Sequence, residues 1–283
     1  MNTVERDINY TKHLINGSNL IDENYNSIYF HSNEHLKIIF NQIDVKGKEC
    51  LSVLGSGDQT FYMYDRGAKS VDLFDINKLT IYYFYLRRWT IKYLDKFYPD
   101  SLIDKKYILN LLNFVNPKDI NEENAYQYWL KYAHYFEYFK EKLLEELFIG
   151  GNNLKRNNIE DLTRIKSYLD TSDINFYNVD LSDEKIIINK KYDIIFVSNI
   201  IDYMHSMYRI SVYRNNLYDL LKDDGKIIAT YVNNNHRKKD EVILFDRYFK
   251  MMKLDKEYDD LEYKNPGYVY TKNMGRRLKN GRL

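Results

Sequence analysis

The sequence predicts an α/β fold built on a doubly wound, mostly parallel sheet. Short apolar segments rich in β-branched residues alternate with segments of helical periodicity along most of the chain. The first of these apolar segments, 50–54, ends in the glycine turn Gly55-Ser56-Gly57. Apolar strands separated by helices are typical of a parallel sheet that helices cover on both faces.

The pattern places the elements in order along the chain. Strands are expected at 50–54, 70–74, 175–179, 192–197 and 226–232, the last after a turn at Asp223-Asp224-Gly225. Weaker strand candidates at 254–263 and 267–271 would form a hairpin around Asn265-Pro266-Gly267. Helices are expected at 34–43, 59–66, 77–98, 122–148, 208–221 and 242–251.

Residues 100–170 read as helix only, and we expect them to form a helical insertion between the second and third strands. The apolar positions of 122–148 recur every three or four residues, which predicts one long amphipathic helix. Residues 1–45 form an N-terminal helical segment, and 1–283 a single domain.

Composition excludes several classes of protein. Lys and Arg exceed Asp and Glu by 42 − 41 = 1, so there is no strong nucleic-acid signal. One cysteine excludes an internal disulfide and a cysteine-rich zinc site, which fits a cytoplasmic protein. The start carries acids and no secretory signal, and no apolar run approaches the ~20 residues of a transmembrane segment.

The glycine turn and Asp75 together predict an adenosine-containing ligand. Glycines let backbone approach a ligand closely, and an acid at the end of the next strand can accept hydrogen bonds from ribose hydroxyls. Asp75 follows Gly55 by 20 residues, the separation that this geometry requires. Asp58 at the mouth of the turn would repel a phosphate, and Thr60 replaces the third glycine of a dinucleotide site. These features disfavour NAD and suit S-adenosylmethionine, whose methionyl end is positively charged at nitrogen and sulfur.

Three segments carry a resemblance to a known family. Val53-Leu54-Gly55-Ser56-Gly57-Asp58-Gln59, Gly67-Ala68-Lys69-Ser70-Val71 and Phe74-Asp75-Ile76-Asn77 resemble the first two motifs of class I S-adenosylmethionine-dependent transferases. The Gly-Ser-Gly-Asp-Gln form is most similar to the branch related to S-adenosylmethionine:diacylglycerol 3-amino-3-carboxypropyltransferase. The resemblance covers roughly 28–232 and implies a Rossmann-like fold of the class I methyltransferase type, with S-adenosylmethionine as cofactor. Val53 and Gln59 depart from the common methyltransferase pattern, in which an acid and a glycine stand at these positions.

The resemblance also implies the cofactor-binding residues. The amino-acid part of the cofactor is expected at the turn, the ribose at Asp75, and the adenine at Ile76 and Asp180, while Ser198 and Asn199 would border the reaction centre. The full expected set is Tyr29, Gly55, Ser56, Gly57, Asp58, Gln59, Asp75, Ile76, Asn77, Asp180, Leu181, Ser198 and Asn199.

Residues after the fourth strand are candidates for the chemistry itself. Asp202, Tyr203 and His205 could deprotonate or orient an acceptor, although a polar loop ahead of a helix explains them equally well. The segment from His31 to His35 matches the zinc-peptidase pattern His-x-x-Glu-His, which needs both histidines on one helix. Because Ser32-Asn33 reads as a helix cap, His31 falls outside that helix, and we expect no metal site.

These inferences give an S-adenosylmethionine-dependent transferase that moves a methyl group to an unknown acceptor. Transfer of the 3-amino-3-carboxypropyl group is the alternative within the same fold, because an acceptor can attack the γ-carbon of that group in place of the methyl carbon, two of the three carbons on the sulfonium. A binding module without catalysis is the alternative of another class. The acceptor and the oligomeric state stay open.

Overall fold

The fold was examined in a computed structural model of the chain. It describes residues 3–17, 22, 24–29, 32, 34, 36–93, 105–135, 148–149, 162–171, 174–204, 206–230, 249–253 and 268–272.

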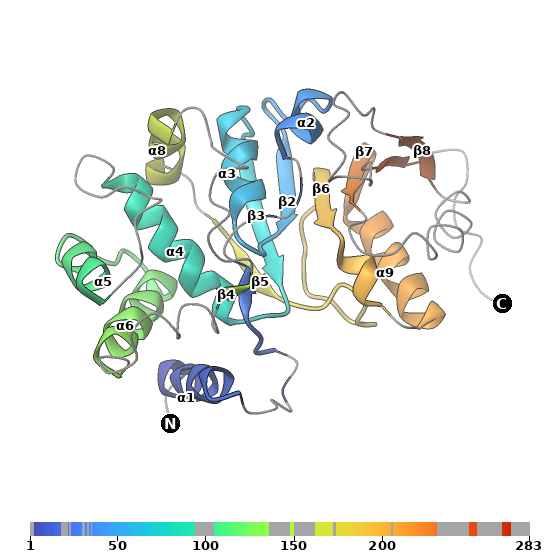
Figure 1. Ribbon diagram of the computed structural model, residues 1–283. Coiled ribbons are helices and arrows are strands. Elements are labelled where there is room, and N and C mark those ends of the chain that lie inside the picture. The colour runs from blue at the N-terminus through green and yellow to red at the C-terminus, as the bar shows by residue number, and fades with distance from the viewer. Residues whose placement is uncertain are drawn as a thin grey trace, which may run out of the picture. The chain divides into compact units, whose positions relative to one another are not determined.

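A seven-stranded sheet organises the molecule, with strand order β5-β3-β2-β6-β7-β9-β8 (Figure 1). The strands are β2 (Glu49–Val53), β3 (Ser70–Asp75), β5 (Phe176–Asn178), β6 (Tyr192–Ser198), β7 (Leu221–Ala229), β8 (Phe249–Lys253) and β9 (Tyr268–Lys272). The pairs β2–β3, β2–β6 and β6–β7 are parallel, whereas β9 runs antiparallel to both β7 and β8.

This order confirms the predicted Rossmann-like, mostly parallel sheet of the class I methyltransferase type. The strand order reverses between β2 and β6, and in doubly wound sheets ligands bind at the carboxyl ends of the strands beside such a reversal. The glycine turn follows the carboxyl end of β2 directly.

The chain divides into two compact units, which we describe separately. Unit 1 comprises Met1–Ser32, Leu54–Phe61 and Asp75–Asn178; unit 2 comprises Asn33–Val53, Tyr62–Phe74 and Val179–Leu283. The remaining elements are the helices α1 (Thr3–Ile15), α2 (Leu36–Asn41), α3 (Asp58–Asp65), α4 (Leu79–Lys92), α5 (Lys105–Leu112), α6 (Ile120–Tyr135), α8 (Leu162–Thr171), α9 (Met207–Leu220), the 3₁₀ helix η1 (Ile200–Tyr203) and the short paired strands β1 (Ile28–Tyr29) and β4 (Phe148–Ile149).

The core of unit 1 forms around α4, which packs against α6 and α8, while α6 also packs against α1 and α5 (Figure 1). Polar groups are paired inside this core: Asp7 accepts hydrogen bonds from the Tyr25 and Tyr82 hydroxyls, and Trp129 Nε1 donates to the Tyr82 carbonyl. Such pairing explains how tyrosines can be buried here, because each buried hydroxyl needs a partner.

The core of unit 2 contains the central strands. Ile195 and Phe196 of β6 and Ile227 and Ile228 of β7 are fully buried, as the continuous apolar runs predict for a sheet covered on both faces. The expected turn at Asp223-Asp224-Gly225 lies inside β7, where the register jumps from the pair Tyr192–Leu221 to the pair Ile194–Lys226. Asp224 has a φ of 61° there, so the turn becomes an irregularity within a longer strand.

Two helix predictions are wrong at one end. The expected helix 242–251 includes Phe249–Met251, which form part of the strand β8. The Phe249 ring packs edge-on against Tyr270 of β9, and this packing between strands overrides the helical periodicity of the local sequence. The expected helix 122–148 includes Phe148, which pairs with Ile28 in a strand, so 100–170 is not helix only. The hairpin partner of β9 is therefore β8; the expected strand 254–263 lies outside the described residues.

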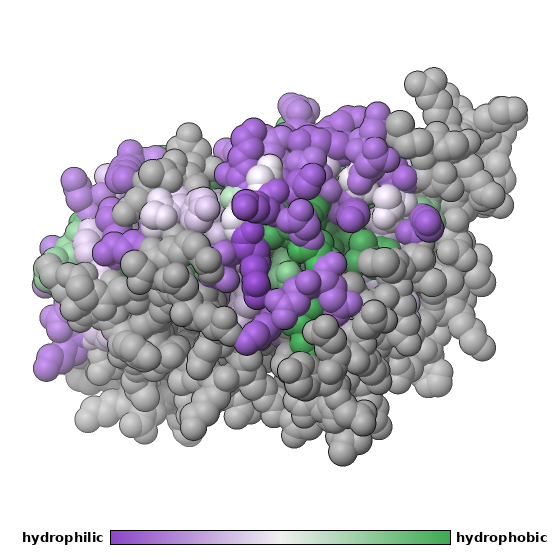
Figure 2. Space-filling view, turned by 90° about the horizontal axis from the view of Figure 1, so that it is seen from above, coloured by the Kyte–Doolittle hydropathy of each residue, from purple (hydrophilic) through white to green (hydrophobic). Residues whose placement is uncertain are grey.

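No helix in the described part of the chain is long and apolar enough to span a bilayer. Hydrophilic residues make up most of the described surface on the face seen in Figure 2, and a group of hydrophobic ones lies near its middle.

Candidate functional site

The turn after β2 is held in a conformation that requires glycine. The Gly57 amide donates to the Leu54 carbonyl at 2.6 Å, and Gly55 and Gly57 have φ angles of 48° and 85°. Residues other than glycine rarely adopt such φ angles.

The two glycines differ in their surroundings. A Cβ at Gly57 would lie 3.1 Å from Phe84 Cδ2, so the missing side chain lets α4 pack against the turn. A Cβ at Gly55 would meet no described atom within 4 Å. The backbone at Gly55 is thus open to close approach by a ligand, as the sequence predicts.

Asp75 lies against this turn, so the predicted ribose-binding acid and the glycine turn are neighbours. Its Oδ2 accepts a hydrogen bond from the Gly55 amide and its Oδ1 one from the Asn77 amide, each at 2.9 Å. The residue is 8% exposed, and burial raises the pKa of its carboxyl from 3.8 to about 6, opposed by these backbone donors. The Ile76 amide is a third backbone donor to this carboxylate. A carboxylate offers about four lone-pair sites, so it keeps the capacity to accept a hydrogen bond from a ribose hydroxyl.

Asp58 is almost fully buried at the start of α3, and its charge is paired. Its Oδ2 accepts from the Ser32 amide at 2.7 Å and from Ser56 Oγ at 3.0 Å, and its Oδ1 lies 2.7 Å from Arg87 Nη2. The Asp58 amide contacts Ser56 Oγ at 3.3 Å, where a phosphate would otherwise bind a helix N-terminus. Arg87 therefore offsets the charge of the Asp58 carboxylate, so repulsion of a phosphate by Asp58 is weaker than the sequence predicts. The Asp58 amide, which could bind a phosphate, already has a partner.

Asn77, expected at the cofactor, holds a neighbouring segment in place. Its Nδ2 donates to the Asn26 carbonyl at 2.8 Å and the Ser27 carbonyl at 3.3 Å, and its Oδ1 accepts from the Leu79 amide. Asn178, which the sequence analysis missed, donates from Nδ2 to the carbonyls of Asp75 and Ile76. The two side chains thus tie the segment that follows β3 to residues 26–27 and to β5.

The other expected residues of unit 1 lie near the same segments. Gln59 is buried, and its Nε2 lies 3.4 Å from Ser32 Oγ. Ile76 and Tyr29 are half-buried, the latter in β1.

In unit 2, a polar cluster occupies the carboxyl ends of β6 and β7. The buried Glu34 carboxylate accepts hydrogen bonds from Ser198 Oγ and, at 2.9 Å, from Thr230 Oγ1. Ser198 has a φ of 53°, and Asn199 Nδ2 is a buried donor with no hydrogen-bond partner among the described residues. From the sequence, Glu34 is expected in the zinc-like pattern and at the start of the helix 34–43, with no role at the cofactor.

Asp180 and Leu181, also in unit 2, have turn-forming contacts. Asp180 Oδ1 accepts from the Ser182 amide and hydroxyl, and its Oδ2 pairs with Arg209. Leu181 is buried, and its carbonyl accepts from Asn216.

The candidate catalytic residues are placed only in part. Asp202 and Tyr203 lie in η1, with Tyr203 half exposed, and His205 lies outside the described residues. His31 and His35 of the zinc-like pattern are also outside them, and the described residues contain no cluster of metal-ligating side chains.

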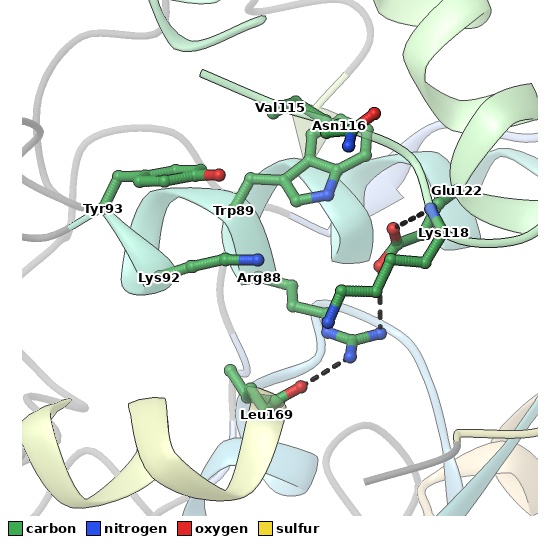
Figure 3. Close-up of a pocket in the computed structure, with 9 residues that line it drawn as sticks. All are labelled: Arg88, Trp89, Lys92, Tyr93, Val115, Asn116, Lys118, Glu122 and Leu169. Atoms are coloured by element: carbon green, nitrogen blue, oxygen red, sulfur yellow. Dashed lines mark hydrogen bonds and ion pairs between the residues drawn. The ribbon is translucent and has the colours of Figure 1, made fainter. Parts of the chain in front are cut away.

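A small pocket in unit 1 lies between α4, α6 and α8 (Figure 3). Arg88 dominates it: the guanidinium lies 3.5 Å from a Glu122 carboxylate oxygen and donates to the Leu169 carbonyl. Glu122 in turn accepts from the Lys118 amide at 2.9 Å, near the start of α6. These contacts join three helices.

Comparisons with known proteins give a likeness of fold. No protein-family model matches the sequence, and no curated protein matches it. Three solved structures that it resembles are a TehB-like S-adenosylmethionine-dependent methyltransferase from Corynebacterium glutamicum (13% identity, 95% of this chain and 98% of that one, TM-score 0.44), the N-methyltransferase NodS from Bradyrhizobium japonicum (8%, 84% and 93%, 0.42), and magnesium protoporphyrin IX methyltransferase from Synechocystis (10%, 96% and 85%, 0.40). At such identities and scores, the proposal of function depends on the chain's own residues.

Proposed function

We propose that the chain is an S-adenosylmethionine-dependent transferase that moves a methyl group to an acceptor. The observation that carries the proposal is the hydrogen bond between Asp75 and the Gly55 amide, which unites a ribose-binding acid with an open glycine turn. The Asp58 amide already has Ser56 Oγ as its partner, so the N-terminus of α3 is a poor phosphate site.

The residues present fit this cofactor. Asp75 would hold the ribose, Ile76 would contact the adenine, and the backbone at Gly55 and Ser56 would lie along the methionyl part. Asn77 and Asn178 act indirectly, because their contacts fix the segment that carries Asp75. When bound, S-adenosylmethionine supplies an activated sulfonium, so the protein needs only to align an acceptor and exclude water.

Within unit 2, we propose that the polar cluster at the carboxyl ends of β6 and β7 supplies a general base. Ser198 and Thr230 fix the Glu34 carboxylate, which can take the proton that an attacking N–H or O–H group loses. Asp202, Tyr203 and His205 remain candidates for orienting the same acceptor.

Transfer of the 3-amino-3-carboxypropyl group is the second candidate. It is favoured by Val53 in the place of the usual acid and by the resemblance of the Gly-Ser-Gly-Asp-Gln turn to that branch. The by-product separates the two: methyl transfer leaves S-adenosylhomocysteine, whereas aminocarboxypropyl transfer leaves methylthioadenosine.

The test is calorimetry with S-adenosylmethionine and with methylthioadenosine, on the wild-type protein and on Asp75→Ala. We expect both ligands to bind the wild-type protein, and Asp75→Ala to weaken both by about 30-fold or more, since hydrogen bonds to a charged group contribute about 1.5–3 kcal/mol each. Mass spectrometry of the thioether formed with cell-extract fractions then identifies the transferred group. Absence of binding to the wild-type protein contradicts the proposal, and binding without any thioether favours a non-catalytic module.

A further inference from the structure

Arg87, which no sequence motif includes, lies at the glycine turn. Its side chain extends from α4, and Nη1 donates to the Ser56 carbonyl at 2.7 Å while Nη2 lies 2.7 Å from Asp58 Oδ1. The guanidinium also lies 4.8 Å from the centre of the Phe61 ring and 5.7 Å from that of Tyr83. Contacts with two aromatic rings and the turn hold it in one orientation.

The two charges of the Arg87–Asp58 pair differ in accessibility. The Asp58 side chain is 2% exposed and that of Arg87 17%. Both Asp58 oxygens already accept hydrogen bonds or an ion pair from the protein. By exposed fraction the guanidinium is the more accessible charge of the pair, and an anionic ligand group suits it.

We propose that Arg87 binds the α-carboxylate of S-adenosylmethionine and so selects ligands that retain the amino-acid part. This inference rests on the proposed function. A guanidinium presents its N–H groups in a planar fork that matches a carboxylate, and Asp58 and the aromatic rings pre-orient that fork. Asp58 is then a positioning residue, and the ion pair faces a ligand part that is itself a zwitterion.

The experiment compares ligands that share the adenosyl group and differ in the carboxylate. Calorimetry is performed with S-adenosylmethionine, S-adenosylhomocysteine, decarboxylated S-adenosylmethionine and methylthioadenosine on the wild-type protein, Arg87→Met and Arg87→Lys. Lys131→Met is the matched control, because it removes another cation of unit 1, whose pair with Glu5 is much more exposed.

We expect Arg87→Met to lower the affinity for S-adenosylmethionine and S-adenosylhomocysteine by about 10- to 100-fold. The affinity for the two ligands without a carboxylate should change by less than about threefold. Arg87→Lys should recover part of the loss, since it keeps the charge without the fork. Equal weakening of all four ligands would show that Arg87 only supports the turn and would overturn the inference, as would no weakening at all.

The wild-type protein provides a test that needs no variant, should Arg87→Met fail to fold. Decarboxylated S-adenosylmethionine should bind the wild-type protein at least tenfold more weakly than S-adenosylmethionine; equal affinities would overturn the inference. If methylthioadenosine and S-adenosylmethionine both fail to bind, the proposed function itself fails, which is a different outcome from loss of carboxylate selection.

Discussion

Arg87 and Arg88 are consecutive residues of α4 with similar burial, yet they serve two different regions of unit 1. Arg87 contacts a loop, the glycine turn, through a carbonyl and the Asp58 carboxylate. Arg88 contacts Glu122 of α6 and the Leu169 carbonyl of α8. Successive residues of a helix point about 100° apart, so one helix can support a ligand-binding turn with one arginine and join helices with the next.

The largest expected effect is on the free energy of unfolding, which should depend on Arg88, the arginine that joins the helices. Arg88→Met should lower the free energy of unfolding by about 3–5 kcal/mol, because it leaves the buried Glu122 carboxylate without its ion-pair partner. The affinity of the folded protein for methylthioadenosine should not change. Urea titration measures the first quantity and calorimetry the second.

Lys131→Met is the control for that prediction, since the pair of Lys131 with Glu5 is much more exposed. We expect it to cost less than about 1 kcal/mol. An equally small effect of Arg88→Met would contradict a joining role for Arg88.

The next effect concerns the turn region and pH. The pKa of Asp75 is raised from 3.8 to about 6, so the carboxylate gains a proton as the pH falls through about 6. Ribose hydroxyls donate to the charged form, and the affinity for methylthioadenosine should fall up to about tenfold per pH unit below that value. Calorimetry between pH 5 and 8 (a range of about three units around this pKa) measures it.

Stability without ligand should change in the opposite direction. The folded protein binds the proton of Asp75 more tightly than the unfolded chain does, so this group raises the free energy of unfolding as the pH falls from about 6 to about 4, by about 3 kcal/mol. Asp75→Asn should show neither dependence. If the affinity for methylthioadenosine were independent of pH in the wild-type protein, Asp75 would not be the ribose acceptor.

The smallest effects compare the two glycines of the turn. Gly57→Ala should destabilise the protein by about 2 kcal/mol, because it combines a positive φ with a Cβ that crowds Phe84. Gly55→Ala should cost about 1 kcal/mol for its backbone conformation alone. Relative to the stability that each variant loses, Gly55→Ala should weaken binding of S-adenosylmethionine more than Gly57→Ala does. Thermal unfolding and calorimetry on both variants test whether Gly55 serves ligand approach while Gly57 serves packing against α4.

Much of the fold can be read from local patterns in the sequence. Runs such as 194–197 are apolar throughout, and a strand buried on both faces requires this composition. The pairing of Asp75 with the turn also follows from spacing, because strand length and the intervening helix fix where the second strand ends.

The remainder depends on contacts distant in sequence. Nothing near Asn77 shows that its amide binds the carbonyls of Asn26 and Ser27, about fifty residues away along the chain. Likewise, two adjacent arginines look alike until the neighbours of α4 are known. Phe249–Lys253 join a sheet through Tyr268–Lys272, and this pairing overrides a helix-like local pattern.

The position of β9 has a consequence for synthesis of the chain. Among the described strands, β8 contacts the sheet only through β9, which follows it in sequence and separates it from β7. A nascent chain that has emerged only as far as β8 therefore offers that strand no docking place. Completion of this sheet edge must wait until Tyr268–Lys272 have left the ribosome, whereas β2, β3 and β6 can pair earlier.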